Sequence, residues 1–257
     1  MRELPEFQVL ANHLNSYFKG KILLDLKVKN TKKLKDIQVE LDKCLKGNIL
    51  KSVYRYGKEL HFQFVNNVVL GMNLMLHGNI QSFGKVNENK FTIVELVFNK
   101  GKGLALTDWQ GNATIKLNPE ENCGIDALSE ELYDYLLSTL QNKAKIKAMI
   151  TNEKVIRGIG NVYADEILWE AKISPFSVAS AIPEFKIKAL ANAVRKVLLD
   201  AEKQLSSKKM VLLPSEPHDF LKIYGKEGES SPNGSIIKVN KIARHCTYYT
   251  DEQELYK

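Results

Sequence analysis

The stretch RGIGNVYADEIL, residues 157–168, decides how this sequence is interpreted. Two glycines, Gly158 and Gly160, precede Asn161 and a run whose apolar side chains recur at helical spacing. Glycine allows the backbone to approach another group closely, and the amide groups at the N-terminus of a helix attract anions. We therefore interpret the stretch as a phosphate clamp, in which Asn161 and the helix amides donate hydrogen bonds.

Two other interpretations of the glycine pattern stay open. A dinucleotide-binding turn needs a strand before the glycines and an acidic residue about 20 positions later. The residues before the glycines, 143–150, have a helical pattern instead, which disfavours this interpretation. A Gly-rich turn that only joins two packed helices would also fit the stretch when it is judged alone.

The same stretch, continued by ISP at residues 173–175, and the first six residues, MRELPE, resemble the formamidopyrimidine-DNA glycosylase and endonuclease VIII (Fpg/Nei) family. The resemblance implies a helix-two-turn-helix that grips DNA through Gly158, Gly160 and Asn161. It also implies a DNA-repair protein of the base-excision type, a DNA glycosylase and abasic-site lyase. Its partner would be damaged or abasic double-stranded DNA, from which it flips out a nucleotide.

The catalytic residues implied by the resemblance lie at the start of the chain. Members of the family begin Met-Pro-Glu-Leu-Pro-Glu, and the proline amine, freed by removal of methionine, is the nucleophile. Glu3 matches the glutamate that gives and takes protons, whereas Arg2 replaces the proline. Because methionine removal needs a small second residue, Met1 is expected to stay. A relocated amine would then come from Met1 or from Lys58.

Three functions follow from this departure. The chain could be a lyase with a relocated amine, a monofunctional glycosylase in which Glu3 activates water, or a damaged-DNA-binding protein whose catalysis has lapsed because Arg2 replaces the nucleophile. Glu3 also has a simpler interpretation, since an acidic residue near the start of a helix stabilises the helix dipole.

Three further residues are implied to contact DNA. Lys58, in RYGKEL, matches a strand-borne lysine that holds a phosphate of the damaged nucleotide, and Arg244 matches a phosphate-gripping arginine of the family's finger. Leu76, in NLMLHG, falls where a methionine fills the gap left by the extruded base, although a core leucine on a strand is equally compatible. Trp109 is expected to be half-buried and structural, with stacking on a base as the alternative.

The hydrophobic pattern changes once along the chain. Between Phe7 and Phe18 it predicts a helix that starts after Pro5, and alternation then predicts half-buried antiparallel strands, for example in residues 24–28, 60–64 and 113–117. After Pro119 the pattern is helical in residues 127–140, 146–150, 162–171 and 187–205. The final residues contain hairpin signals around SPNG, residues 231–234.

Together, pattern and resemblance predict an α+β fold. We expect an N-terminal β-sandwich with its helix in residues 1–120, a helical helix-two-turn-helix domain in residues 121–212, and a zincless-finger β-hairpin in residues 213–257. Family members carry a four-cysteine zinc finger in that last part. An ungapped alignment places Ser231, Gly234, Tyr249 and Glu252 at the four cysteine positions, so we expect no zinc and no other cofactor.

Composition limits the remaining possibilities. A net charge of +7 over 257 residues favours a polyanionic partner such as DNA. No apolar run is long enough to cross a membrane, so we expect no membrane partner. The three cysteines lie far apart, which favours a reduced, cytoplasmic location, and the resemblance to a DNA-repair family implies association with the nucleoid. We expect a monomer.

Overall fold

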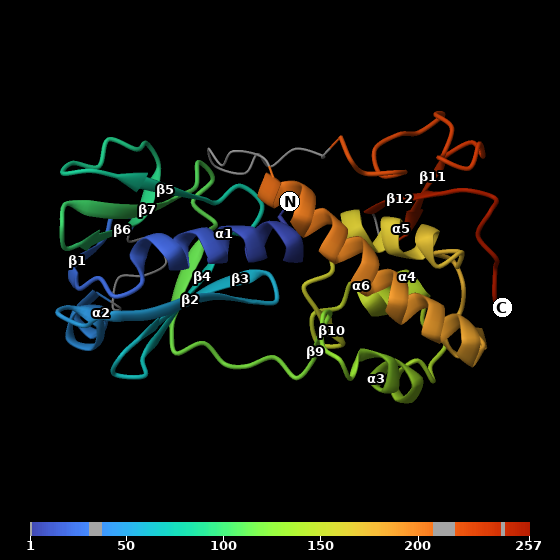
Figure 1. The fold of residues 1–257 in the computed structure, drawn as a ribbon, viewed down its shortest axis with the longest axis horizontal. Coiled ribbons are helices and arrows are strands. Elements are labelled where there is room, and N and C mark those ends of the chain that lie inside the picture. Colours follow the sequence, from blue (N-terminus) through green and yellow to red (C-terminus); the bar gives the residue numbers. More distant parts are fainter. Residues whose placement is uncertain (1, 31–37, 208–218, 243–244) are drawn as a thin grey trace. The chain divides into compact units, whose positions relative to one another are not determined.

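The computed structural model describes residues 2–30, 38–207, 219–242 and 245–257 (Figure 1). Met1 and Arg244, both predicted to have functional roles, lie outside the described residues. The chain divides into two compact units. Arg2 and the described residues between Glu6 and Glu121 belong to the first unit. Residues 3–5, 122–207 and the described residues from 219 onwards belong to the second.

The first unit is built on two antiparallel four-stranded sheets, with strand orders β1-β6-β7-β5 and β2-β3-β4-β8. This confirms the predicted β-sandwich. Its strands are β1 (Leu23–Val28), β2 (Leu50–Tyr56), β3 (Glu59–Phe64), β4 (Val69–Asn73), β5 (Asn79–Phe83), β6 (Thr92–Phe98), β7 (Lys102–Thr107) and β8 (Thr114–Leu117). In β1 the predicted alternation fails at Leu24, which is exposed, because the pairing register shifts between Leu23 and Asp25.

Helix α1 (Leu4–Phe18) contacts both sheets of the first unit (Figure 1). The Phe18 ring lies 4.9 Å from that of Phe98 in β6, and the side-chain oxygen of Asn15 accepts the amide of Val53 in β2 at 2.9 Å. The helix begins at Leu4, earlier than predicted, because Pro5 is tolerated in a first turn, where its missing N–H has no partner to lose. A shorter helix, α2 (Gln38–Leu45), follows β1.

The second unit is mostly helical. Its elements are β9 (Ile125–Asp126), α3 (Leu132–Thr139), α4 (Ile146–Ile150), β10 (Ile156–Arg157), α5 (Asn161–Glu170), the 3₁₀ turn η2 (Ala179–Ala181), α6 (Glu184–Ser207), β11 (Lys238–Ile242) and β12 (His245–Tyr249). The helix predicted in residues 127–140 begins only at Leu132. Residues 125–126 pair with β10 instead, and the Asp126 side chain accepts the amide of Leu128 in a turn.

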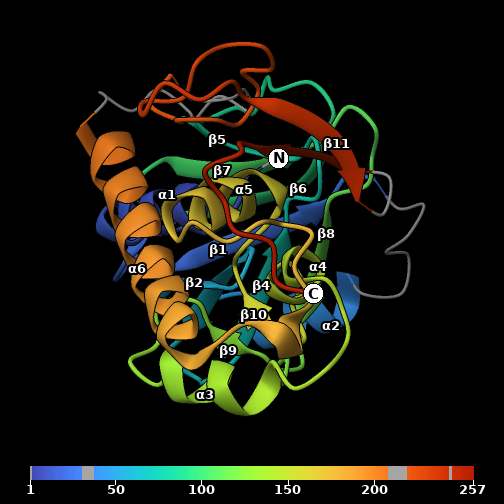
Figure 2. The same cartoon turned by 90° about the vertical axis from the view of Figure 1, so that its right-hand side faces the viewer.

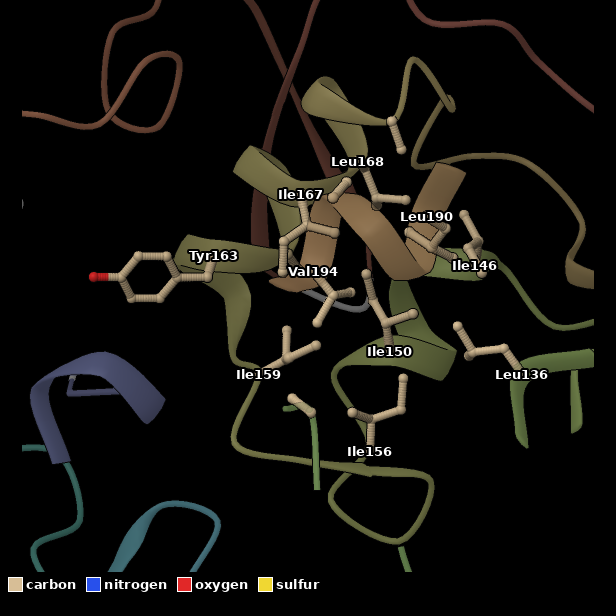
Figure 3. Packing of buried hydrophobic residues seen from close by; sticks show 14 of the residues in the cluster. Leu136, Ile146, Ile150, Ile156, Ile159, Tyr163, Ile167, Leu168, Leu190 and Val194 are labelled. Atoms are coloured by element: carbon tan, nitrogen blue, oxygen red, sulfur yellow. The ribbon is translucent and has the colours of Figure 1, made fainter. Parts of the chain in front are cut away.

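Helices α5 and α6 pack together around the core of the second unit (Figures 2 and 3). Side chains from α4, α5 and α6 meet there, among them Ile150, Ile167, Leu168, Leu190 and Val194 (Figure 3). All five side chains are fully buried. Because α5 contributes a whole apolar face to this core, its position and the direction of its N-terminus are fixed by packing.

The predicted C-terminal hairpin is present: β11 pairs antiparallel with β12. A small second core lies beneath it, in which Trp169 of α5 contacts the buried Ile223 and Ile237, with Tyr248 packed alongside. We call residues 219–257 the finger. Among the helices of the described residues, none is both long and apolar enough to cross a membrane.

Candidate functional site

The carboxylate of Glu3 sits on the N-terminus of α5. Its Oε2 accepts the amides of Gly160 at 2.7 Å and Tyr163 at 3.2 Å, and its Oε1 accepts the amide of Val162 at 2.9 Å. Glu3 is fully buried. Three amide donors and the positive end of a helix dipole favour the ionised carboxylate in this place.

The two glycines of the motif are explained by the same contact. A Cβ atom on Gly160 would lie 2.3 Å from Oε1 of Glu3, and one on Gly158 would lie 2.7 Å from Cδ1 of Leu4. Gly158 also has a φ of +103°, and its carbonyl accepts the amide of Leu4 at 2.9 Å. Glycine is required here because the first residues of the chain dock directly on the backbone of the motif. The two sequence motifs therefore form one site.

This arrangement changes the predicted phosphate clamp. The amides of Gly160, Val162 and Tyr163 are bound to Glu3, and the amide of Gly158 donates to Glu153 Oε1 at 3.0 Å. Carboxylates of the chain thus occupy the positions predicted for a phosphate oxygen. Asn161, the first residue of α5, is half-buried and stays a predicted phosphate contact through its side chain.

Glu3 does interact with a helix dipole, but the helix is α5 and not the one that it precedes. Glu3 directly precedes α1, yet its carboxylate caps α5, which begins 158 residues later at Asn161. A contact at that sequence separation fixes the acid relative to a second, independently packed helix. Such positioning is more than a local charge preference needs.

Two acidic residues that sequence reasoning missed extend the site along α5. Asp165 forms a buried ion pair with Lys147 at 2.6 Å and accepts the amide of Tyr248 at 2.9 Å. Burial raises the pKa of Asp165 to about 7, while Lys147 opposes the rise. Two successive acids, Asp165 and Glu166, in an otherwise largely apolar stretch of sequence were the available signal.

Glu166 serves as an anchor for the start of the finger. Its two carboxylate oxygens accept the backbone amides of Lys222, Ile223 and Tyr224, each at 2.9 Å. A carboxylate that receives three amide donors is strongly held in one orientation. Helix α5 therefore holds Glu3 at one end and the finger along its length.

In the first unit, the Arg2 side chain is fixed by hydrogen bonds. Its Nη1 donates to the carbonyl of Gly78 at 2.6 Å, and its Nη2 donates to Asn79 Oδ1 at 3.0 Å. Burial lowers the pKa of Arg2, and the nearby Glu6 opposes this. A guanidinium remains charged even so, and its bonds tie the start of the chain to the NLMLHG segment.

The predicted DNA contacts of the first unit lie in turns. Lys58 is half-buried between β2 and β3 instead of within a strand. Leu76 is 52% exposed after β4, so the alternative of a core leucine is wrong. Trp109 is 61% exposed instead of half-buried, and its ring lies 5.0 Å from that of His77. Exposed apolar side chains of this size are available to contact a base.

Known proteins resemble both parts of the chain. Residues 1–115 match the family model of the formamidopyrimidine-DNA glycosylase N-terminal domain, and residues 123–210 match that of the formamidopyrimidine-DNA glycosylase H2TH domain. The formamidopyrimidine-DNA glycosylase of Wolbachia pipientis subsp. Culex pipiens is 31% identical over 217 residues, which cover 78% of each chain. That of Lactobacillus gasseri is 27% identical over the full length of both chains.

Solved structures show the same fold. A mutant of the Lactococcus lactis enzyme in complex with DNA containing Fapy-dG superposes with a TM-score of 0.87 at 24% identity, covering 98% of this chain and 99% of that one. The Lactococcus lactis enzyme in complex with DNA containing an abasic site gives a TM-score of 0.85 at 23% identity, with the same coverage.

Proposed function

Because the chain belongs to the formamidopyrimidine-DNA glycosylase family, we propose that it is a DNA-repair glycosylase that binds damaged or abasic double-stranded DNA and flips out the damaged nucleotide. The observation that carries the proposal is the carboxylate of Glu3, held by three backbone amides at the N-terminus of α5. It is the group whose chemistry the reaction needs, in a fixed orientation.

Excision of a base breaks the glycosidic bond, and a proton must move as the base departs. A carboxylate fixed by backbone donors, as Glu3 is, needs no reorganisation when the transition state forms. The same carboxylate can take a proton from an attacking water or amine. Glu3 is therefore the proposed proton-transfer group in either case.

The attacking group must be one other than Arg2. Arg2 is not a nucleophile, because its guanidinium is permanently charged and is bound to Gly78 and Asn79. We propose the amine of Met1 as the nucleophile, with Lys58 as the second candidate. An amine that attacks C1′ displaces the base, and opening of the sugar ring then gives a Schiff base that borohydride can trap.

The test uses a duplex with one abasic site, with and without borohydride, and a matched duplex with an oxidised purine. Wild type is expected to form a trapped adduct that mass spectrometry maps to Met1 or Lys58. Glu3→Gln should lose base release and strand cleavage, whereas Glu120→Gln, at an exposed position, should keep both. Base release without any adduct would leave Glu3 as the activator of water and would disprove the proposed amine.

A lapsed, DNA-binding protein is the second candidate, and the hydrogen-bonded Arg2 in place of a nucleophile favours it. It predicts tight binding of abasic DNA with neither adduct nor base release. Strand cleavage that depends on Glu3 would rule it out.

The mode of DNA binding follows from charge. A protein with a net charge of +7 that contacts phosphates through Lys58, Asn161 and Arg244 should bind as a monomer in a salt-sensitive manner. Its preference should be for gapped or abasic duplexes, whose deformation costs little. Such a partner implies that the protein works at the chromosome, inside the cell.

A further inference from the structure

The finger of this chain differs from the zinc finger that the family resemblance implies. Of the residues at the four cysteine positions, only Glu252 is a usual zinc ligand, because Ser231, Gly234 and Tyr249 offer neither thiolate nor imidazole. Among the described residues, no group of three or more His, Cys, Asp or Glu side chains could hold a metal ion. The residues present do not fit zinc.

Two of the four cysteine positions, Ser231 and Glu252, belong to a polar cluster. Glu252 Oε1 accepts the hydroxyl of Ser231 at 2.6 Å, and its Oε2 accepts the side-chain amide of Asn233 at 2.6 Å. The ammonium of Lys172 forms an ion pair and a hydrogen bond with the same Oε2. A cation of the protein thus sits against the carboxylate, where a bound metal would be repelled.

We propose that Glu252, Ser231, Asn233 and Lys172 form a clasp that closes the finger and fastens it to α5, in the role that zinc has in a metal-bound finger. The clasp joins both ends of the hairpin, since residues 231–233 precede β11 and Glu252 follows β12. It also reaches outside the finger, because Lys172 is the second residue after the end of α5.

The backbone at Lys172 supports this role. Lys172 has a φ of +56°, and the amide of Ile173 donates to Leu168 at 3.0 Å, which is the helix-ending motif that usually has glycine at this place. A lysine adopts this conformation at a cost in strain. The lysine side chain found there in place of glycine reaches Glu252.

The groups around the clasp strengthen its hydrogen bonds and keep Glu252 ionised. Ser231 is buried, and the Lys172 ammonium also lies 4.4 Å from the centre of the Trp169 ring. Although burial alone would raise it, the hydrogen bonds from Lys172, Ser231 and Asn233 lower the pKa of Glu252 to about 2. The carboxylate is therefore ionised at neutral pH and holds three donors at once.

A set of matched variants of the full chain tests the clasp. Glu252→Gln keeps the shape of the side chain and removes its charge. Lys172→Gly removes the ammonium, and glycine adopts a φ of +56° without strain. Asp251→Asn is the control, because this neighbouring carboxylate is exposed and pairs only with Lys238 among the described contacts. Ser231→Ala is a milder variant if Glu252→Gln does not fold.

The measurements are zinc content, the effect of a chelator on the melting temperature, and hydrogen exchange of the finger amides. We expect no stoichiometric zinc and no chelator effect in wild type. The finger amides should exchange about tenfold faster in Glu252→Gln and Lys172→Gly, and at the wild-type rate in Asp251→Asn. Stoichiometric zinc, or unchanged exchange in both clasp variants, would overturn the proposal. None of these readouts depends on glycosylase activity, so failure of the clasp and failure of the proposed function are distinguishable.

Discussion

The amide of Gly160 donates a hydrogen bond of 2.7 Å to the carboxylate of Glu3, and no side chain fits between them. A Cβ atom on Gly160 would lie 2.3 Å from Oε1 of Glu3. The glycine therefore fixes where the acid can sit. The role of Gly160 in this chain is therefore to leave room for the Glu3 carboxylate.

Gly160→Ala should displace Glu3 from the helix N-terminus. We expect a loss of about 1–3 kcal/mol in the free energy of unfolding and a loss of base release similar to that of Glu3→Gln. Gly84→Ala is the control, because a Cβ atom there would meet open space. Urea unfolding and a single-turnover excision assay measure the two effects. Full activity in Gly160→Ala would show that the position of Glu3 is not critical.

The buried pair of Lys147 and Asp165 should be important for stability. Lys147→Met leaves the fully buried Asp165 without its cation and should cost about 3–5 kcal/mol. The partly exposed pair of Lys196 and Glu170 gives the comparison, since Lys196→Met leaves Glu170 paired with Lys222 and should cost less than about 1 kcal/mol. Urea unfolding at neutral pH distinguishes the two, and equal losses would contradict the assigned role of burial.

Much of this architecture could be predicted from the sequence. The strands, the N-terminal helix and the four later helices follow from local periodicity, and the hairpin follows from its turn residues, whereas the sandwich arrangement and the importance of residues 1–6 were implied by the resemblance to a known family. The contact of Glu3 with Val162 could not be predicted from periodicity, because it depends on how two distant segments pack. The glycines signalled a close approach but not the identity of the approaching group.

The roles of Asp165 and Glu166 were missed for a related reason. Acidic residues on a helix usually face solvent, and only the packing of α5 against α6 and the finger shows that these two are buried. Trp109 was misjudged in the opposite direction, since it was expected to be half-buried and is largely exposed, as single apolar residues at turns often are, and for Leu76 only the alternative of a core position was wrong.

The exposure of Trp109 and Leu76 makes a separable prediction for DNA binding. Trp109→Ala and Leu76→Ala should change the free energy of unfolding by less than about 0.5 kcal/mol, because both side chains are largely exposed. If either contacts an unstacked base, binding of abasic DNA should weaken by about 1–3 kcal/mol. Val39→Ala, also highly exposed, is the control. Unchanged binding in both variants would leave these side chains without a role in DNA contact.

The clasp of the finger should give a defined pH dependence. The folded-state pKa of Glu252 is about 2, below the usual value of 4.5. Its contribution to stability is therefore complete above about pH 4.5 and is lost as the pH falls towards 2. Urea unfolding at pH 7, 4 and 3 should show wild type converging on Glu252→Gln as the pH falls. A difference that stays constant over this range would contradict an ionised Glu252.

Arg2→Pro should restore the amine that the family uses. A small second residue allows removal of Met1, and the new terminal amine would directly precede Glu3. The variant loses the hydrogen bonds of Arg2 to Gly78 and Asn79, so we expect a cost of about 1–3 kcal/mol in stability. The amount of adduct trapped by borohydride on abasic DNA should nevertheless rise above that of wild type.

Arg2→Leu is the matched control for this gain, because it removes the same hydrogen bonds but keeps Met1. It should share the loss of stability without the gain in adduct. Mass spectrometry of the intact variants shows whether methionine was removed, and peptide mapping shows which amine reacted. If Arg2→Pro lost its methionine and still trapped no more DNA than wild type, an amine at the start of the chain would not reach the sugar, and Lys58 would become the candidate for the attacking amine.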